Sequence, residues 1–183
     1  MSTLIIHPQD HSTDFLDIVY KDIPNKLVIR NSFSKDDIKE LIVEFDRVMM
    51  MGHGSPSGLF SVGQFDVDGA FIIDNSFVDI LSEKEDSVYI WCHADQFVEA
   101  NNLKGFYSGM FISEVGEAMF CGVMEANQKM VDESNYGFCD MLAKVINEKT
   151  TKLYSSIMRD YGELANINKV ASYNVERLKF KVI

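Results

Sequence analysis

The chain contains 183 residues, 46% of them hydrophobic, and carries a formal net charge of -11 at pH 7. A chain of this size buries the core of one domain without metal or disulfide support, so we treat residues 1–183 as a single domain. The acidic charge, which no basic stripe offsets, repels a phosphate backbone and argues against nucleic acid as a partner.

The cysteines and the N-terminal sequence indicate a cytoplasmic protein. Cys92, Cys121 and Cys139 are an odd number and lack the paired spacing of disulfide-stapled secreted domains. The N-terminal residues carry no basic leader, and their apolar stretch is too short for a signal peptide. No run approaches the roughly 20 apolar residues that cross a bilayer, so we expect no membrane partner.

Short apolar runs that stop at glycine, proline or polar residues predict five strands in the first two thirds of the chain. These runs are 4–7, 27–29, 48–51, 88–91 and 106–112. Two further runs, 59–62 and 70–73, are expected to pair as a small hairpin.

Apolar residues at spacings of three and four predict helices between these strands. Residues suited to N-cap positions precede three of the helices: Ser12 or Thr13, Ser34, and Ser113. From about residue 133 the pattern is helical, and these helices are expected to cover one face of the sheet. The closing segment 177–183 alternates apolar and polar residues, as an edge strand or a tail would.

The alternation of strands and helices determines the predicted fold class. Parallel strands joined by helices form right-handed crossovers, which place helices on both faces of the sheet. The pattern therefore predicts an α/β fold with three αβα layers around a mostly parallel central sheet.

Two of the predicted strands end at residues suited to catalysis. The run 48–51 leads into Gly52-His53-Gly54, and the run 88–91 leads into Cys92. Ligands bind at the carboxyl ends of the strands in open parallel sheets, so the Cys92 thiol and the His53 imidazole are expected to meet. Taken alone, a strand-end cysteine is more often a small buried hydrophobe, and a histidine between glycines often caps a turn. The pairing is what indicates catalysis.

This order of features resembles the caspase-like cysteine peptidases, the group that includes caspases, metacaspases, gingipains and separases. In that group a hydrophobic block precedes each catalytic residue, as 48–51 precedes His53-Gly54 and 88–91 precedes Cys92. The similarity extends by topology over about residues 1–125. The chain departs from the group at Trp91, where a small residue often precedes the nucleophile.

The resemblance implies that Cys92 attacks a peptide carbonyl and that His53 activates the thiol and protonates the leaving amine. The tetrahedral oxyanion needs preorganised donors, and the backbone N–H groups of Gly54 and Cys92 are the expected pair. Replacement of Gly54 by valine is predicted to reduce activity more than stability. His93 is not expected to act as the base, because adjacent residues of an extended segment point to opposite sides.

Four carboxylates follow the predicted strand ends and are expected to rim the same edge of the sheet: Asp10, Asp14, Asp95 and Glu114. Together they are predicted to bind an Arg or Lys side chain of a substrate. The alternative for each is a charge that stabilises the N-terminus of a helix.

No metal or cofactor is expected. The histidines and cysteines lack a recognisable ligand spacing, and the glycine-rich segment 52–58 lacks the Gly-Lys-Ser/Thr ending of a phosphate loop. The predicted function is a cysteine peptidase that cleaves a peptide or protein substrate, with a preference for a basic residue at the cleaved position. Two alternatives stay open: a non-catalytic caspase-like interaction module and a flavodoxin-like domain that binds a small ligand. The sequence leaves the oligomeric state open.

Overall fold

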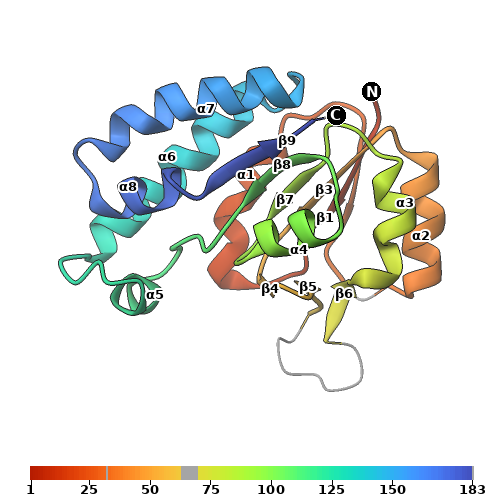
Figure 1. The fold of residues 1–183 in the computed structure, drawn as a ribbon, viewed down its shortest axis with the longest axis horizontal. Helices are drawn as coiled ribbons and strands as arrows, with labels where there is room; N and C mark the ends of the chain where they lie inside the picture. The colour runs from red at the N-terminus through yellow and green to blue at the C-terminus, as the bar shows by residue number, and fades with distance from the viewer. Residues whose placement is uncertain (32, 63–69, 183) are drawn as a thin grey trace.

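A mostly parallel sheet of six strands forms the centre of the computed structural model, which describes residues 1–31, 33–62 and 70–182 (Figure 1). In spatial order the strands are β2 (Lys26–Ile29), β1 (Thr3–Ile6), β3 (Arg47–Met51), β7 (Val88–Ile90), β8 (Gly105–Ser108) and β9 (Leu178–Lys181). The first five run parallel, and β9 pairs antiparallel with β8 at the edge. The closing segment is therefore an edge strand.

Helices cover both faces of this sheet, which confirms the predicted α/β layering. One face packs against α1 (Asp17–Tyr20), α6 (Gln128–Val145), α7 (Thr150–Ala165) and α8 (Lys169–Val175). The other face packs against α2 (Lys35–Glu44), α3 (Val78–Ser82) and α4 (Ala94–Ala100). Successive side chains of a strand alternate between the faces, so Met49 and Met51 lie in the first core and Met50 lies in the second. The helices that follow residue 127 lie together on one face, as predicted.

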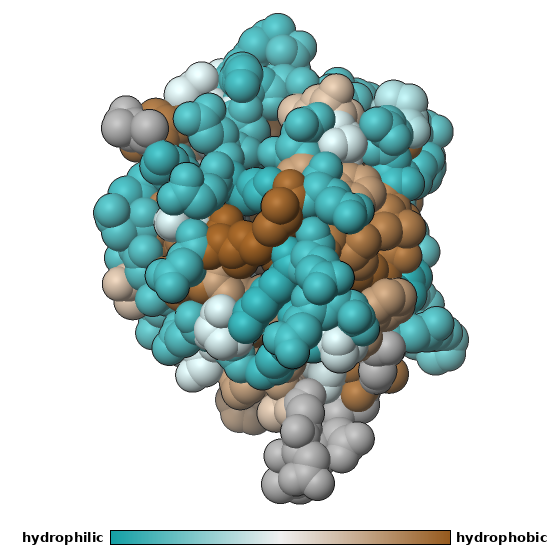
Figure 2. Space-filling view, turned by 90° about the vertical axis from the view of Figure 1, so that its right-hand side faces the viewer, coloured by the Kyte–Doolittle hydropathy of each residue, from teal (hydrophilic) through white to brown (hydrophobic). Residues whose placement is uncertain are grey.

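The face of the molecule that carries α2 and α3 is mainly hydrophilic, with a hydrophobic band at its centre and a second hydrophobic area toward the right-hand edge of the view (Figure 2). Val43 of α2 is 67% exposed. Within the described ranges, no helix is both long enough and apolar enough to cross a membrane.

A small antiparallel sheet lies beyond the end of β3. It contains β4 (Gly54–Ser55), β5 (Gly58–Phe60) and β6 (Phe71–Ile73), and Figure 1 shows it below the carboxyl ends of the central strands. The predicted pairing of 59–62 with 70–73 is confirmed for the parts that form β5 and β6, and β4 adds a third strand.

Several predicted boundaries are wrong by a few residues. Asp10, not Ser12 or Thr13, caps the first helical segment, the 3-10 helix η1 (His11–Leu16), because its carboxylate accepts from the Ser12 backbone N–H. Glu114, not Ser113, is the N-cap of α5 (Val115–Phe120). Ser34 caps α2 as predicted, accepting a hydrogen bond from the Asp37 N–H.

Two further boundaries differ from the prediction. The helix predicted from about residue 133 starts at Gln128, because Asn127 caps it by accepting from the Met130 N–H. The strand predicted over 106–112 ends at Ser108, and the chain then leaves the sheet at Gly109, whose N–H donates to the Arg177 carbonyl at 2.8 Å.

Candidate active site

His53 and Cys92 follow neighbouring parallel strands. Met51 of β3 pairs with Ile90 of β7. His53 lies two residues after Met51, and Cys92 lies two residues after Ile90. Both side chains line one small pocket of about 20 Å³, with Gly52 and Phe111 among its other walls. The structure thus brings the two predicted catalytic residues to one pocket.

The Cys92 thiol is protonated at neutral pH. Its Sγ donates to the Phe111 carbonyl oxygen at 3.7 Å and lies 4.0 Å from Oε1 of Glu117. Burial, and then the negative charge of Glu117, raise the pKa of Cys92 to about 12. A base must therefore remove the thiol proton if this sulfur is to act as a nucleophile.

The His53 ring contacts the segment that follows β1. Its Nε2 lies 2.6 Å from Oγ of Ser12, and the Ser12 hydroxyl lies 2.7 Å from Oδ1 of Asp10. Oδ1 of Asp10 is 4.0 Å from Nε2 of His53. Burial raises the pKa of Asp10, but hydrogen bonds from the hydroxyl and backbone N–H of Ser12 outweigh it and hold that pKa below its usual value. Asp10 is therefore an anion at neutral pH.

Gly54 lies directly beneath the indole of Trp91. A Cβ added at Gly54 would come within 2.2 Å of Cδ1 of Trp91 and 2.6 Å of the Gly58 carbonyl oxygen. The indole is itself buried, and its Nε1 donates to the Ser55 carbonyl at 3.0 Å. A side chain at position 54 would thus disrupt packing between β4 and β7. This geometry revises the prediction for the Gly54 substitution, since stability is lost together with any activity.

Trp91 is the residue at which the chain departs from the caspase-like pattern. Its ring packs in the core against Tyr89 and Phe97, with ring centroids 5.8 and 5.7 Å away. The large residue before Cys92 therefore serves to attach the small sheet and α4 to the central sheet.

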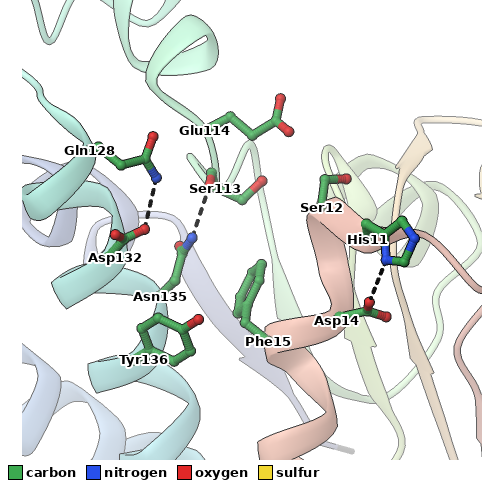
Figure 3. Close-up of a pocket in the computed structure, with 10 residues that line it drawn as sticks. All are labelled: His11, Ser12, Asp14, Phe15, Ser113, Glu114, Gln128, Asp132, Asn135 and Tyr136. Atoms are coloured by element: carbon green, nitrogen blue, oxygen red, sulfur yellow. Dashed lines mark hydrogen bonds and ion pairs between the residues drawn. The ribbon is translucent and has the colours of Figure 1, made fainter.

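A larger cavity of about 360 Å³ adjoins the His53–Cys92 pocket, and Phe15 and Ser113 line both (Figure 3). Three carboxylates border it: Asp14 from η1, Glu114 at the start of α5 and Asp132 from α6. The Nε2 of Gln128 donates to Asp132 at 2.8 Å, and the Nδ2 of Asn135 donates to the Ser113 carbonyl at 2.9 Å, so α6 forms one wall. The sequence prediction missed Asp132, because nothing local indicates that the first turns of α6 approach the start of α5.

The four predicted substrate-binding carboxylates fall into different environments. Asp14 and Glu114 border the larger cavity, but Asp14 also pairs with Arg30, a cation that it shares with Asp17. Asp10 instead caps η1 beside His53, and Asp95 pairs with Lys179 of β9 at 3.0 Å. The helix-terminus alternative describes all four: Asp10 and Glu114 are the N-caps of η1 and α5, and Asp14 and Asp95 lie in the first turns of η1 and α4. Asp95 is also held by its ion pair to the edge strand.

The remaining histidines have structural contacts. His93 adopts a left-handed conformation, with φ 67°, at the start of α4, and its Nδ1 lies 3.2 Å from Nε2 of Gln96. The extended backbone assumed for His93 is therefore wrong. Its ring contacts Gln96 of α4. His7 is buried and contacts Tyr20 and Thr13. Across residues 1–31, 33–62 and 70–182, no three His, Cys, Asp or Glu side chains are grouped so that they could hold a metal ion.

Comparison of the sequence with models of known protein families finds no match, and comparison with curated proteins finds none either.

Proposed function

We propose that this protein is a caspase-like cysteine peptidase in which Cys92 is the nucleophile and His53 is the general base and acid. The observation that carries the proposal is the shared pocket of these two side chains at the ends of β3 and β7. The arrangement around them supports it as well. His53-Gly54 follows the third strand of the central sheet along the chain and Cys92 follows the fourth, as the resemblance to the caspase-like group requires.

The protonation state of Cys92 determines how the first step proceeds. Because the thiol is neutral, His53 takes its proton as the sulfur attacks the peptide carbonyl. The S–C bond forms while the π electron pair of the carbonyl moves to oxygen, beside the backbone N–H groups of Gly54 and Cys92. The C–N bond then breaks, and the amine leaves with the proton from the imidazolium, which gives a thioester.

Water completes the cycle. His53 takes a proton from the attacking water, the new C–O bond forms, and the C–S bond breaks. The thiolate recovers the proton from the imidazolium, and the carboxylic acid product leaves.

The larger cavity favours a basic side chain next to the cleaved bond. Within the described part of the chain, neither Glu114 nor Asp132 makes an ion pair with a Lys or Arg side chain, whereas Asp14 already pairs with Arg30. Two carboxylates in a partly enclosed cavity attract a cation more strongly than they would in open water. We therefore infer cleavage after Arg or Lys.

Turnover of fluorogenic peptides tests this proposal. Peptides with Arg or Lys at the cleaved position should be hydrolysed, and matched peptides with Asp or Leu should not. Cys92→Ala should abolish the activity, and His53→Ala should reduce it by at least ~10²-fold. Cys121→Ala is the matched control, because this thiol is also partly exposed.

The outcomes separate the alternatives. Labelling of Cys92 by a thiol-directed peptide without any turnover would favour an interaction module over an enzyme. A thermal shift with a nucleotide or flavin, together with no peptide cleavage, would favour a domain that binds a small ligand.

A further inference from the structure

The Ser12 hydroxyl lies within hydrogen-bond distance of both Asp10 and His53, and it has only one hydrogen to donate. It lies 2.7 Å from Oδ1 of Asp10 and 2.6 Å from Nε2 of His53. Asp10 is anionic and only accepts hydrogen bonds, so Ser12 must donate to it. The Ser12 oxygen then accepts from His53, which requires a hydrogen on Nε2. In the neutral imidazole this leaves Nδ1 unprotonated.

The carboxylate that directs this arrangement is itself held firmly. Oδ1 of Asp10 also accepts from the backbone N–H of Ser12 at 2.9 Å, as the N-cap of η1. Ser12 is thus attached to Asp10 through both its backbone and its hydroxyl. Oδ1 of Asp10 itself lies 4.0 Å from Nε2 of His53.

The same local geometry occurs a second time in the chain without a histidine contact. Asp74 caps the 3-10 helix η2 (Asn75–Phe77), and it accepts from the N–H of Ser76 at 2.9 Å and from its hydroxyl at 2.7 Å. The Asp-x-Ser sequence therefore begins a 3-10 helix at both η1 and η2. What distinguishes Ser12 is its contact with the candidate base, 41 residues away in the sequence.

We propose that Ser12 and Asp10 form a hydrogen-bonded pair that fixes the tautomer and orientation of His53, so that Nδ1 is the nitrogen that accepts the Cys92 proton. Ser12 is a positioning residue in this scheme, because its own hydrogen points to Asp10 and it is not activated as a nucleophile. The proposal rests on the proposed function for its catalytic meaning, but the tautomer exists whether or not the protein cleaves peptides.

Long-range ¹H–¹⁵N correlation spectra of the labelled protein test the tautomer directly. At about pH 8.5, above the ordinary imidazole pKa, the His53 ring should show a protonated Nε2 and an unprotonated Nδ1. Ser12→Ala should shift His53 to a mixture of tautomers, and Ser12→Thr should restore the single form. Ser76→Ala removes the equivalent hydroxyl from η2 and should leave the His53 signals unchanged.

Kinetics give a second, independent readout. Ser12→Ala should lower kcat by ~10²-fold with little change in KM, and Ser12→Thr should recover most of it. A protonated Nδ1 in the unmodified protein, or equal spectra for Ser12→Ala and Ser76→Ala, would overturn the positioning role even if peptides are cleaved. The expected tautomer without any cleavage would leave this role intact and reject the proposed function alone.

Discussion

At the scale of single residues, the most consequential neighbour of Cys92 is Glu117. The carboxylate of Glu117 accepts hydrogen bonds from the backbone N–H groups of Ser113 and Glu114, which fixes it at the start of α5. Burial is the main cause of the raised pKa of Cys92, and the negative charge of Glu117, 4.0 Å from Sγ, raises that pKa further.

Glu117→Gln should therefore lower the pKa of Cys92 while retaining an amide oxygen for the backbone donors. Burial still raises that pKa, so the thiol stays mostly neutral, but its thiolate fraction at a fixed alkaline pH should rise by roughly 10-fold. Iodoacetamide alkylation of Cys92, followed by peptide mass mapping, measures this. Glu125→Gln changes an exposed carboxylate and is the control. Equal alkylation rates for the two variants would contradict the role of Glu117.

Gly54 gives a second prediction at this scale. Because a Cβ at this position collides with the Trp91 ring, Gly54→Ala should lower the free energy of unfolding by ~1–3 kcal/mol. Gly162→Ala is the control, since a Cβ there meets nothing within 4 Å and alanine is favourable inside α7. Urea unfolding measures both. A Gly54→Ala protein as stable as the Gly162→Ala protein would show that the indole moves aside.

At the scale of elements, the segment from β1 through η1 to α1 determines where the His53 ring is held. His7 follows β1, and its two ring nitrogens contact Tyr20 of α1 at 2.9 Å and Thr13 of η1 at 3.2 Å. Arg30, just after β2, pairs with Asp14 and Asp17 on the outer side of the same segment. This polar network is buried at His7 and partly exposed at Arg30, and it anchors the turn that carries Asp10 and Ser12.

The network predicts a loss of stability at mildly acidic pH. Burial, and then Arg30, lower the pKa of His7 from 6.5 to about 4. The folded protein therefore binds fewer protons at His7 than the unfolded chain, and stability falls as the pH drops from 6.5 towards 4. The urea midpoint should fall over this range, and His7→Gln should flatten the fall relative to His11→Asn, which alters an exposed ring. Parallel pH profiles for the two variants would contradict the assignment to His7.

At the scale of the whole molecule, the sequence predicts the layers better than it predicts the site. Apolar runs such as 48–51 and 88–91 are buried on both sides in a parallel sheet, so each is recognisable without its neighbours. Their alternation with helical spacing is sufficient to predict the fold class and to place His53 and Cys92 on the lining of one pocket.

The surroundings of the pair depend on long-range packing that no local pattern contains. The contact between Ser12 and His53 depends on the path of η1 after β1, and the position of Asp132 depends on how α6 docks beside α5. Asp95 follows a strand end in the sequence, as the cavity residues Asp14 and Glu114 do. In the structure it pairs instead with Lys179 of the edge strand β9, which lies near the other end of the chain. Contacts such as these could not be predicted, because the two partners are distant in sequence.

Mass mapping after reaction with a peptidyl chloromethyl ketone that ends in arginine tests Cys92 as the nucleophile most directly. This reagent alkylates a thiol only when the peptide is bound beside it, so it tests the nucleophile and the acidic cavity together. The reaction should give one adduct, on Cys92. The adduct should be absent in Cys92→Ala, should form much more slowly in His53→Ala and should be reduced by an excess of an arginine-ended peptide. A matched chloromethyl ketone that ends in aspartate is the control. Equal labelling by the two reagents, or an adduct on Cys121 in place of Cys92, would contradict the proposed nucleophile and cavity.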